Sequence, residues 1–298
     1  MEHNHNHSHV KFDYNKAFAF GIILNTIYII VEFVFGLRIN SMALIADAGH
    51  NLSDVLGLLL AWGASYLART STTNRRTYGL RKSTILAAFF NAIVLLIAVG
   101  AISIEAVRKF ITPEHVGGTT MMIVAGIGVL INTLTALLFL KGKEKDLNIK
   151  GAFLHMAADA GVSLGVVIAG LIITYTNWLW LDPAMSLVIV IVITIGTWGL
   201  LKDSFMLSMD AVPDKINVPK VKQYLTSLPN VKDLHDLHIW GMSTTETALT
   251  AHLVVEKFPD NNQLVETINS KLHDEFGIEH PTIQLELTSE TNNCEKCG

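Results

Sequence analysis

His50-Asn51-Leu52-Ser53-Asp54 lies within a long apolar stretch of this 298-residue chain, and His155-Met156-Ala157-Ala158-Asp159 lies within another. Each stretch therefore carries a histidine followed four positions later by an aspartate. Residues four apart on an α-helix share a face, so each pair should point its imidazole and carboxylate in one direction. Two such faces brought together would form a tetrahedral cage of two histidines and two aspartates, a donor set that suits zinc.

The composition indicates a membrane protein with a soluble part. Half of the residues are hydrophobic and 16% are charged, and the mean hydropathy is +0.41, whereas soluble domains carry about 25% charged residues. The long apolar runs end near residue 201, which predicts a membrane region followed by a soluble region. The net charge of −4 argues against nucleic acid as a partner, because phosphate contacts need a basic surface.

Six stretches are apolar and long enough to cross a bilayer, whose hydrocarbon core needs about 20 helical residues. The first contains Glu32 and lacks a small-residue cleavage site, so we expect it to remain in the mature protein and not to be a signal peptide. The predicted spans are residues 17–37, 42–68, 84–107, 119–140, 151–175 and 178–201.

Basic residues collect in two of the predicted loops and set the expected orientation. Cytoplasmic loops of membrane proteins carry an excess of Lys and Arg. The loops between spans two and three and between spans four and five should therefore be cytoplasmic, together with both termini. This predicts a multi-pass integral membrane protein, and the compact chain with short loops favours a bacterial inner (plasma) membrane. The loop residues are Arg69, Arg75, Arg76, Arg81 and Lys82, then Lys141, Lys143, Lys145 and Lys150.

Longer motifs surround the paired sequences. They are Ala46-Asp47-Ala48-Gly49-His50-Asn51-Leu52-Ser53-Asp54, Tyr78-Gly79-Leu80-Arg81 and His235-Asp236-Leu237-His238-Ile239-Trp240. With the repeated His-x-x-x-Asp pairs, they make nearly the whole chain resemble the cation diffusion facilitator family, of the bacterial zinc, cobalt and cadmium efflux type. The resemblance implies a homodimeric, proton-coupled transporter that moves zinc out of the cytoplasm, with cobalt or cadmium as further substrates. It also implies a transport site made of His50, Asp54, His155 and Asp159.

The ligands themselves indicate how protons would be coupled to metal. A histidine binds metal only when it is neutral and titrates near physiological pH, so protons and zinc compete for one site. Alternating access would then give antiport, with protons as the counter-ion. Asp47 lies on the same helical stripe, where we expect a supporting role.

Other interpretations of the paired motifs remain open. The histidines could simply hydrogen-bond the aspartates between helices, and a membrane-bound metal sensor without transport is the alternative function. A metalloenzyme is disfavoured, because catalytic zinc usually has three protein ligands and an open position, and no general base is evident. No phosphate-binding loop of Walker type occurs, so we expect a secondary active transporter that does not use ATP.

The chain should divide into five regions. Residues 1–15 form a His-rich cytoplasmic tail that can hold metal weakly, residues 16–201 the six-helix domain, and residues 202–213 a linker. Residues 214–290 should form a cytoplasmic α+β domain, and residues 291–298 a Cys-x-x-Cys tail. Hydrophobic periodicity in the α+β domain predicts a helix, two strands, a helix and a strand, at 214–228, 231–241, 245–256, 261–276 and 282–288.

This order is compatible with a ferredoxin-like sandwich, which the resemblance also implies. We expect an antiparallel sheet with helices on one face, leaving the other face free for a partner. The family suggests dimerisation through this domain.

A second metal site is expected in the soluble region. His235 and His252 fall on neighbouring predicted strands, Glu286 falls on the third, and the tail residues Cys294 and Cys297 are within reach. In a reducing cytoplasm a Cys-x-x-Cys pair more often binds metal than forms a structural disulfide. The resemblance carries over His235, His252 and Glu286 as regulatory zinc ligands. No metal is expected in the loop at residues 72–80, which contains neither Asp nor His.

Overall fold

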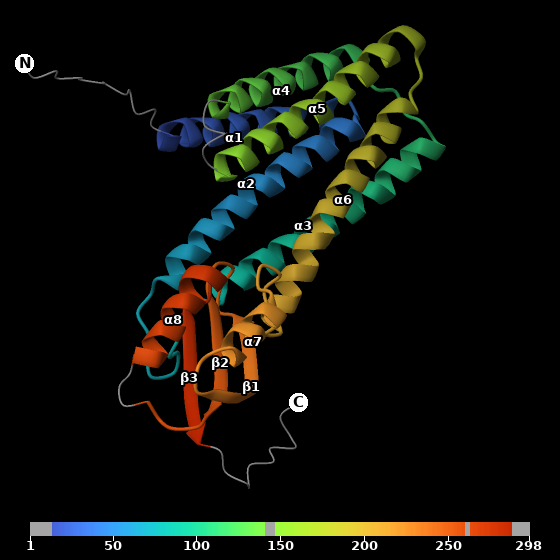
Figure 1. The fold of residues 1–298 in the computed structure, drawn as a ribbon. Helices are drawn as coiled ribbons and strands as arrows, with labels where there is room; N and C mark the ends of the chain where they lie inside the picture. Colours follow the sequence, from blue (N-terminus) through green and yellow to red (C-terminus); the bar gives the residue numbers. More distant parts are fainter. Residues whose placement is uncertain (1–13, 141–146, 260–262, 288–298) are drawn as a thin grey trace, which may run out of the picture. The chain divides into compact units, whose positions relative to one another are not determined.

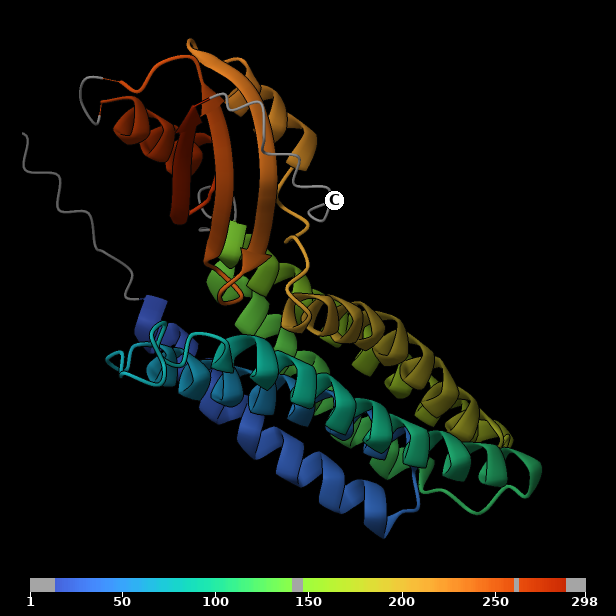
Figure 2. The same ribbon diagram turned by 90° about the horizontal axis from the view of Figure 1, so that it is seen from below.

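The computed structural model describes residues 14–140, 147–259 and 263–287, with side chains described from residue 23 onward except at 139 and 147–152. It divides the chain into two compact units (Figures 1 and 2). The first comprises Met1–Leu58 and Val94–Thr197, and the second comprises Leu59–Ile93 and Trp198–Gly298. The division between units falls within long helices.

In the part of the chain that the structure describes, six long helices precede the sheet. They are α1 (Tyr14–Arg38), α2 (Met42–Ala68), α3 (Ser83–Ile111), α4 (Gly118–Phe139), α5 (Leu147–Thr176) and α6 (Leu181–Ser208). Among the described residues, five helices, α2 to α6, are long and apolar enough to cross a membrane. The backbone groups in the interior of a helix hydrogen-bond one another, which is why such apolar segments form helices.

The last long helix differs from the expected span. It begins at Leu181 instead of Trp178, and it continues to Ser208, so residues 202–208 of the predicted linker are helical. No glycine or proline interrupts residues 200–209. The helix ends where Asp210 adopts a φ of 59° and the Ala211 amide donates to the Met206 carbonyl at 3.0 Å, as in a Schellman termination.

Small residues bring α4 and α5 together in the first unit, where the two helices lie side by side (Figure 1). A methyl group added at Gly118 would lie 2.8 Å from the Gly170 carbonyl oxygen, so neither glycine tolerates a larger side chain. Such close backbone approach is how helices associate in lipid, where apolar side chains gain little by leaving it. The surrounding core is formed by small and branched residues that include Ala43, Leu44, Ala125, Val166 and Ile189.

A buried carboxylate links the start of α2 to the start of α6. Asp182 accepts hydrogen bonds from the Ser41 hydroxyl at 2.5 Å, the Met42 amide at 2.7 Å and the Ala43 amide at 3.2 Å. The first amides of a helix have no partners within it, and a negative charge there is favoured by the helix dipole. Asp182 therefore caps α2 although it lies on another helix.

The second unit contains a small α+β domain. Its elements are α7 (Val218–Thr226), β1 (Val231–Gly241), β2 (Thr247–Val255), α8 (Gln263–Phe276) and β3 (His280–Leu287). The order of helices and strands agrees with the sequence prediction. The strands lie in the order β1-β2-β3 (Figure 1). The two helices contact each other and share one core with the sheet, which includes Val221, Leu225, Leu249, Leu253 and Ile268.

The expectation of an antiparallel sheet is wrong for one of the two strand pairs. β1 and β2 are antiparallel, but β2 and β3 are parallel. The reason is the helix between them, because a crossover connection returns the chain to the same end of the sheet. A short hairpin joins β1 to β2 and makes that pair antiparallel.

Replacing Asp182 with Asn should destabilise the helical unit. The amide has one acceptor oxygen and no charge, so at least one buried donor at the start of α2 loses its partner. We expect a loss of about 2 kcal/mol in the free energy of unfolding, measured by denaturant titration in detergent micelles. Asp203→Asn on the exposed face of the same helix is the matched control. Equal stability of the two variants would contradict the capping role.

Candidate metal-binding sites

The four side chains of the two His-x-x-x-Asp pairs converge within the first unit. His50 Nε2 lies 3.4 Å from Asp159 Oδ1 and 3.8 Å from Asp54 Oδ2. His155 Nε2 lies 3.2 Å from Asp54 Oδ2 and 3.7 Å from Asp159 Oδ2. The two imidazole rings are edge to face, with centroids 6.2 Å apart. Thus α2 and α5 each supply one imidazole and one carboxylate to a common point.

The carboxylate oxygens in this cluster lack compensating donors. Asp54 Oδ2 and Asp159 Oδ2 are buried, and no described group hydrogen-bonds them. The His155 Nε2 atom lies 3.2 Å from Asp54 Oδ2 and 3.7 Å from Asp159 Oδ2, which is ion-pair distance without full hydrogen-bond geometry. Buried charge without a partner is costly in an apolar helix bundle, and a bound cation removes that cost.

The cluster is enclosed on one side and open on the other. The Asp159 side chain is 2% exposed, whereas the His155 side chain is 43% exposed. Ligand atoms of His50, Asp54 and Asp159 all lie within 4.8 Å of one another, as donors around one metal ion would. Two nitrogen and two oxygen donors suit tetrahedral zinc.

Asp47 lies beside this cluster and has a different partner. Its Oδ2 accepts a hydrogen bond from the Ser163 hydroxyl at 2.9 Å, so the carboxylate links α2 to α5. Glu32 on α1 is also fully buried and accepts a hydrogen bond from the Tyr28 hydroxyl at 2.7 Å. The sequence showed Glu32 as a charge within an apolar run, but nothing in the spacing indicated its partner.

A second cluster lies on the sheet of the second unit. The β1–β2 register pairs His235 directly with His252, and their rings are 5.1 Å apart between centroids. Glu286 on β3 joins them, with Oε2 at 3.2 Å from His235 Nε2 and Oε1 at 3.0 Å from His252 Nδ1. Ligand atoms of the three lie within 4.8 Å of one another, and this nitrogen and oxygen donor set fits zinc.

Asp236 belongs to the same cluster and was not predicted from the sequence. The pairing of β1 with β2 shifts between His235 and His238, and Asp236 adopts a φ of 51° there. The bulge turns its carboxylate toward the histidines, with Oδ2 3.6 Å from His252 Nε2. A hydrogen bond with His238 at 2.7 Å lowers the pKa of Asp236, so this carboxylate remains ionised.

Other predicted ligands lie outside the described residues. These are Cys294 and Cys297 in the terminal Cys-x-x-Cys and the histidines of residues 1–9.

Two family models match consecutive parts of the chain. The cation efflux transmembrane domain matches residues 19–207, and the cation efflux protein cytoplasmic domain matches residues 213–288. Together they cover both clusters.

Several relatives align over most of their own length. Zinc transporter ZitB of Escherichia coli is 37% identical over 95% of this chain and 91% of its own. Metal cation efflux system protein CzcD of Cupriavidus metallidurans is 35% identical over 91% and 86%. The cadmium, cobalt and zinc/H(+)-K(+) antiporter of Bacillus velezensis is 33% identical over 98% and 94%. The solved metal-bound C-terminal domain of the CzcD transporter is 34% identical, covers 24% of this chain and 100% of its own, and has a TM-score of 0.22.

Substitutions of Asp54 and Asp47 should separate a ligand from a supporting residue. Losing an outer hydrogen-bond partner typically weakens metal binding by about 10–100-fold, and losing a ligand weakens it more. We therefore expect Asp54→Asn to lower zinc affinity more than about 100-fold and Asp47→Asn by about tenfold, measured by equilibrium dialysis of purified protein carrying His235→Ala, so that the sheet site is silent. The opposite ranking would show that Asp47 is the ligand.

Proposed function

The chain belongs to the cation efflux family, the cation diffusion facilitators, and from this premise we propose that it exports zinc from the cytoplasm in exchange for protons. Cobalt and cadmium are compatible substrates, as in the name of the Bacillus velezensis relative. It is a membrane-embedded transporter and not an enzyme.

One observation carries this proposal. Two membrane-spanning helices bring His50, Asp54, His155 and Asp159 together, and one buried oxygen of each aspartate receives no hydrogen bond from a described residue. A purely structural polar cluster would satisfy these oxygens with protein donors. Lone pairs left available inside a helix bundle instead support a site that takes up and releases a cation.

Proton coupling follows from the same donors. Zinc binds neutral imidazole and ionised carboxylate, so protons and zinc exclude each other from His50 and His155. A site open to the cytoplasm, where protons are scarcer, loads zinc. When the site opens to the outer face, protons displace the metal, and the protonated site returns. Each half of the cycle requires the other, which makes the exchange obligatory.

The remaining architecture completes the proposal. We take α1, a helix of 25 residues, as the sixth span, and we place both termini and the loop carrying Arg69 to Lys82 in the cytoplasm of a bacterial inner membrane. The α+β domain would adopt a ferredoxin-like arrangement, and a second copy of the chain would dimerise through this domain.

The sheet cluster is proposed as a regulatory zinc site. His235, His252 and Glu286 would hold the ion, and the Cys294 and Cys297 tail would add sulfur ligands from the same chain. Asp236 orients His252 from the bulge. The three ligands lie on three different strands, so a bound zinc ion would order these strands together. In this way the site would signal the cytoplasmic zinc concentration to the transporter.

Transport should respond to an opposing proton gradient. In proteoliposomes loaded with a zinc-sensitive dye, zinc uptake should rise when the lumen is acidified, and it should vanish in His50→Ala and Asp159→Ala. Circular dichroism and gel filtration of both variants would show that they are folded. Zinc flux indifferent to the gradient would refute the coupling, and no flux in wild-type vesicles despite zinc binding would favour a sensor.

Zinc binding at the sheet should depend on the tail. Titration of the purified cytoplasmic region, residues 210–298, should give weaker zinc binding when Cys294 and Cys297 are replaced with Ser, and weaker still for His252→Ala. His273→Ala, which changes an exposed histidine on α8, is the matched control. Unchanged affinity and stoichiometry in the double cysteine variant would remove the tail from the site.

A further inference from the structure

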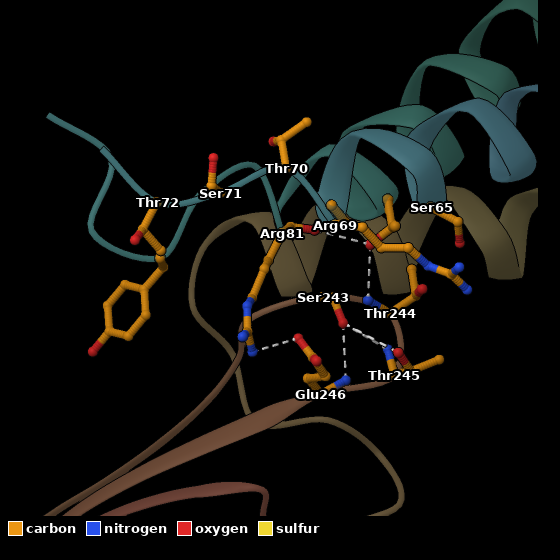
Figure 3. Close-up of a pocket in the computed structure, with 13 residues that line it drawn as sticks. Ser65, Arg69, Thr70, Ser71, Thr72, Arg81, Ser243, Thr244, Thr245 and Glu246 are labelled. Carbon is orange, nitrogen blue, oxygen red and sulfur yellow. Dashed lines mark hydrogen bonds and ion pairs between the residues drawn. The ribbon is translucent and has the colours of Figure 1, made fainter. Parts of the chain in front are cut away.

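A polar pocket lies in the second unit where α2 ends and α3 begins (Figure 3). Its volume is about 490 Å³, and neither of the two metal clusters contributes to it. The lining combines two arginines, one glutamate and many hydroxyl groups. These residues include Ser65, Arg69, Thr70, Arg81, Thr244 and Glu246.

The charge of the pocket favours an anion. Residues 59–93 contain three arginines beyond Arg81 and Lys82, and no Asp or Glu. Arg81 is already engaged, because its guanidinium lies 2.9 Å from Glu246 and 2.6 Å from His280. Arg69 has no acidic partner among the described residues, so its guanidinium remains available to a ligand.

Hydroxyl donors flank the available guanidinium. Figure 3 shows Arg69 extending between Ser65 and Thr244. Neither of these two hydroxyls makes a hydrogen bond with a described residue, although the Thr244 amide donates to the Thr84 hydroxyl at 3.1 Å and so holds the loop in place. A guanidinium with hydroxyl donors on either side is the chemistry that binds a phosphate group.

The position of the pocket along the helix points to a lipid. α2 has 27 residues, so at 1.5 Å per residue it is about 40 Å long, comparable to a bilayer with its headgroups at about 40–45 Å. Trp62 and Tyr66 lie on the stripe that leads to Arg69 and are 74% and 71% exposed. Exposed Trp and Tyr mark the membrane interface.

We propose that this pocket binds the phosphate group of an anionic membrane lipid. Arg69 holds the phosphate, Ser65 and Thr244 donate hydrogen bonds to it, and the acyl chains lie along the Trp62 and Tyr66 stripe. Because Ser65 lies in the last turn of α2, Arg69 follows that helix directly and Thr244 belongs to the β1–β2 loop, the lipid joins the two segments. A soluble phosphate compound could bind the same side chains, so the test must distinguish a lipid from a soluble phosphate.

Native mass spectrometry of the full-length protein in detergent provides the test. The probes are phosphatidylglycerol and phosphatidylcholine with identical acyl chains. We expect the wild type to prefer phosphatidylglycerol, and Arg69→Gln to lower its apparent affinity about tenfold, as for loss of one charge-assisted hydrogen bond. Arg75→Gln removes the same charge from the same loop without lining the pocket, and should change affinity by less than about twofold.

A second variant and a soluble probe complete the design. Thr244→Val should also weaken phosphatidylglycerol binding, which keeps the test informative if Arg69→Gln fails to fold. Equal losses in Arg69→Gln and Arg75→Gln would overturn the proposal in favour of diffuse charge attraction. Equal binding of the two lipids would also overturn it. Glycerol 3-phosphate should not raise the melting temperature, and stabilisation by it that depends on Arg69, without lipid preference, would assign the pocket to a soluble phosphate.

Discussion

A carboxylate oxygen that is buried among apolar helices without a hydrogen-bond donor carries a large desolvation cost, which a cation or a proton can offset. Asp54 and Asp159 each place one such oxygen in the first unit. The glycines of α4 and α5 allow close helix packing without large side chains, and Asp47 links α2 to α5 through Ser163 next to the cluster. The first unit therefore brings two carboxylates together with two imidazoles as their nearest charged or polar partners.

The two clusters differ in the way their geometry is maintained. In the first, one residue pair per helix is set by the 3.6-residue period, so the helix backbone alone orients each imidazole with its carboxylate. In the second, His235, His252 and Glu286 come from three strands, so their meeting depends on strand register. A shift of one residue would send a ligand to the opposite face of the sheet. The sheet cluster is consequently the one that responds to packing of the domain.

Local sequence patterns predicted the features that depend on local structure. The bounds of α2 and β1, and the shared face of His50 and Asp54, follow from hydrophobic runs and helical periodicity. The contribution of Asp182 could not be predicted, because it caps a helix about 140 positions earlier in the chain. Asp236 enters the sheet cluster through a bulge with positive φ, which an aspartate adopts infrequently. The parallel direction of β3 could not be predicted without knowing which edge of the sheet the crossover connection reaches.

The capping of α2 by Asp182 also has a mechanical meaning. Three hydrogen bonds secure the first residues of α2 to the start of α6, so this end of the helix can act as a pivot while its remainder swings. His50 lies eight residues beyond Met42, about 12 Å along the helix axis. A swing of about 10° would displace His50 by about 2 Å, enough to separate it from Asp159. A small rotation about this fixed end would therefore be enough to change the distance between His50 and Asp159.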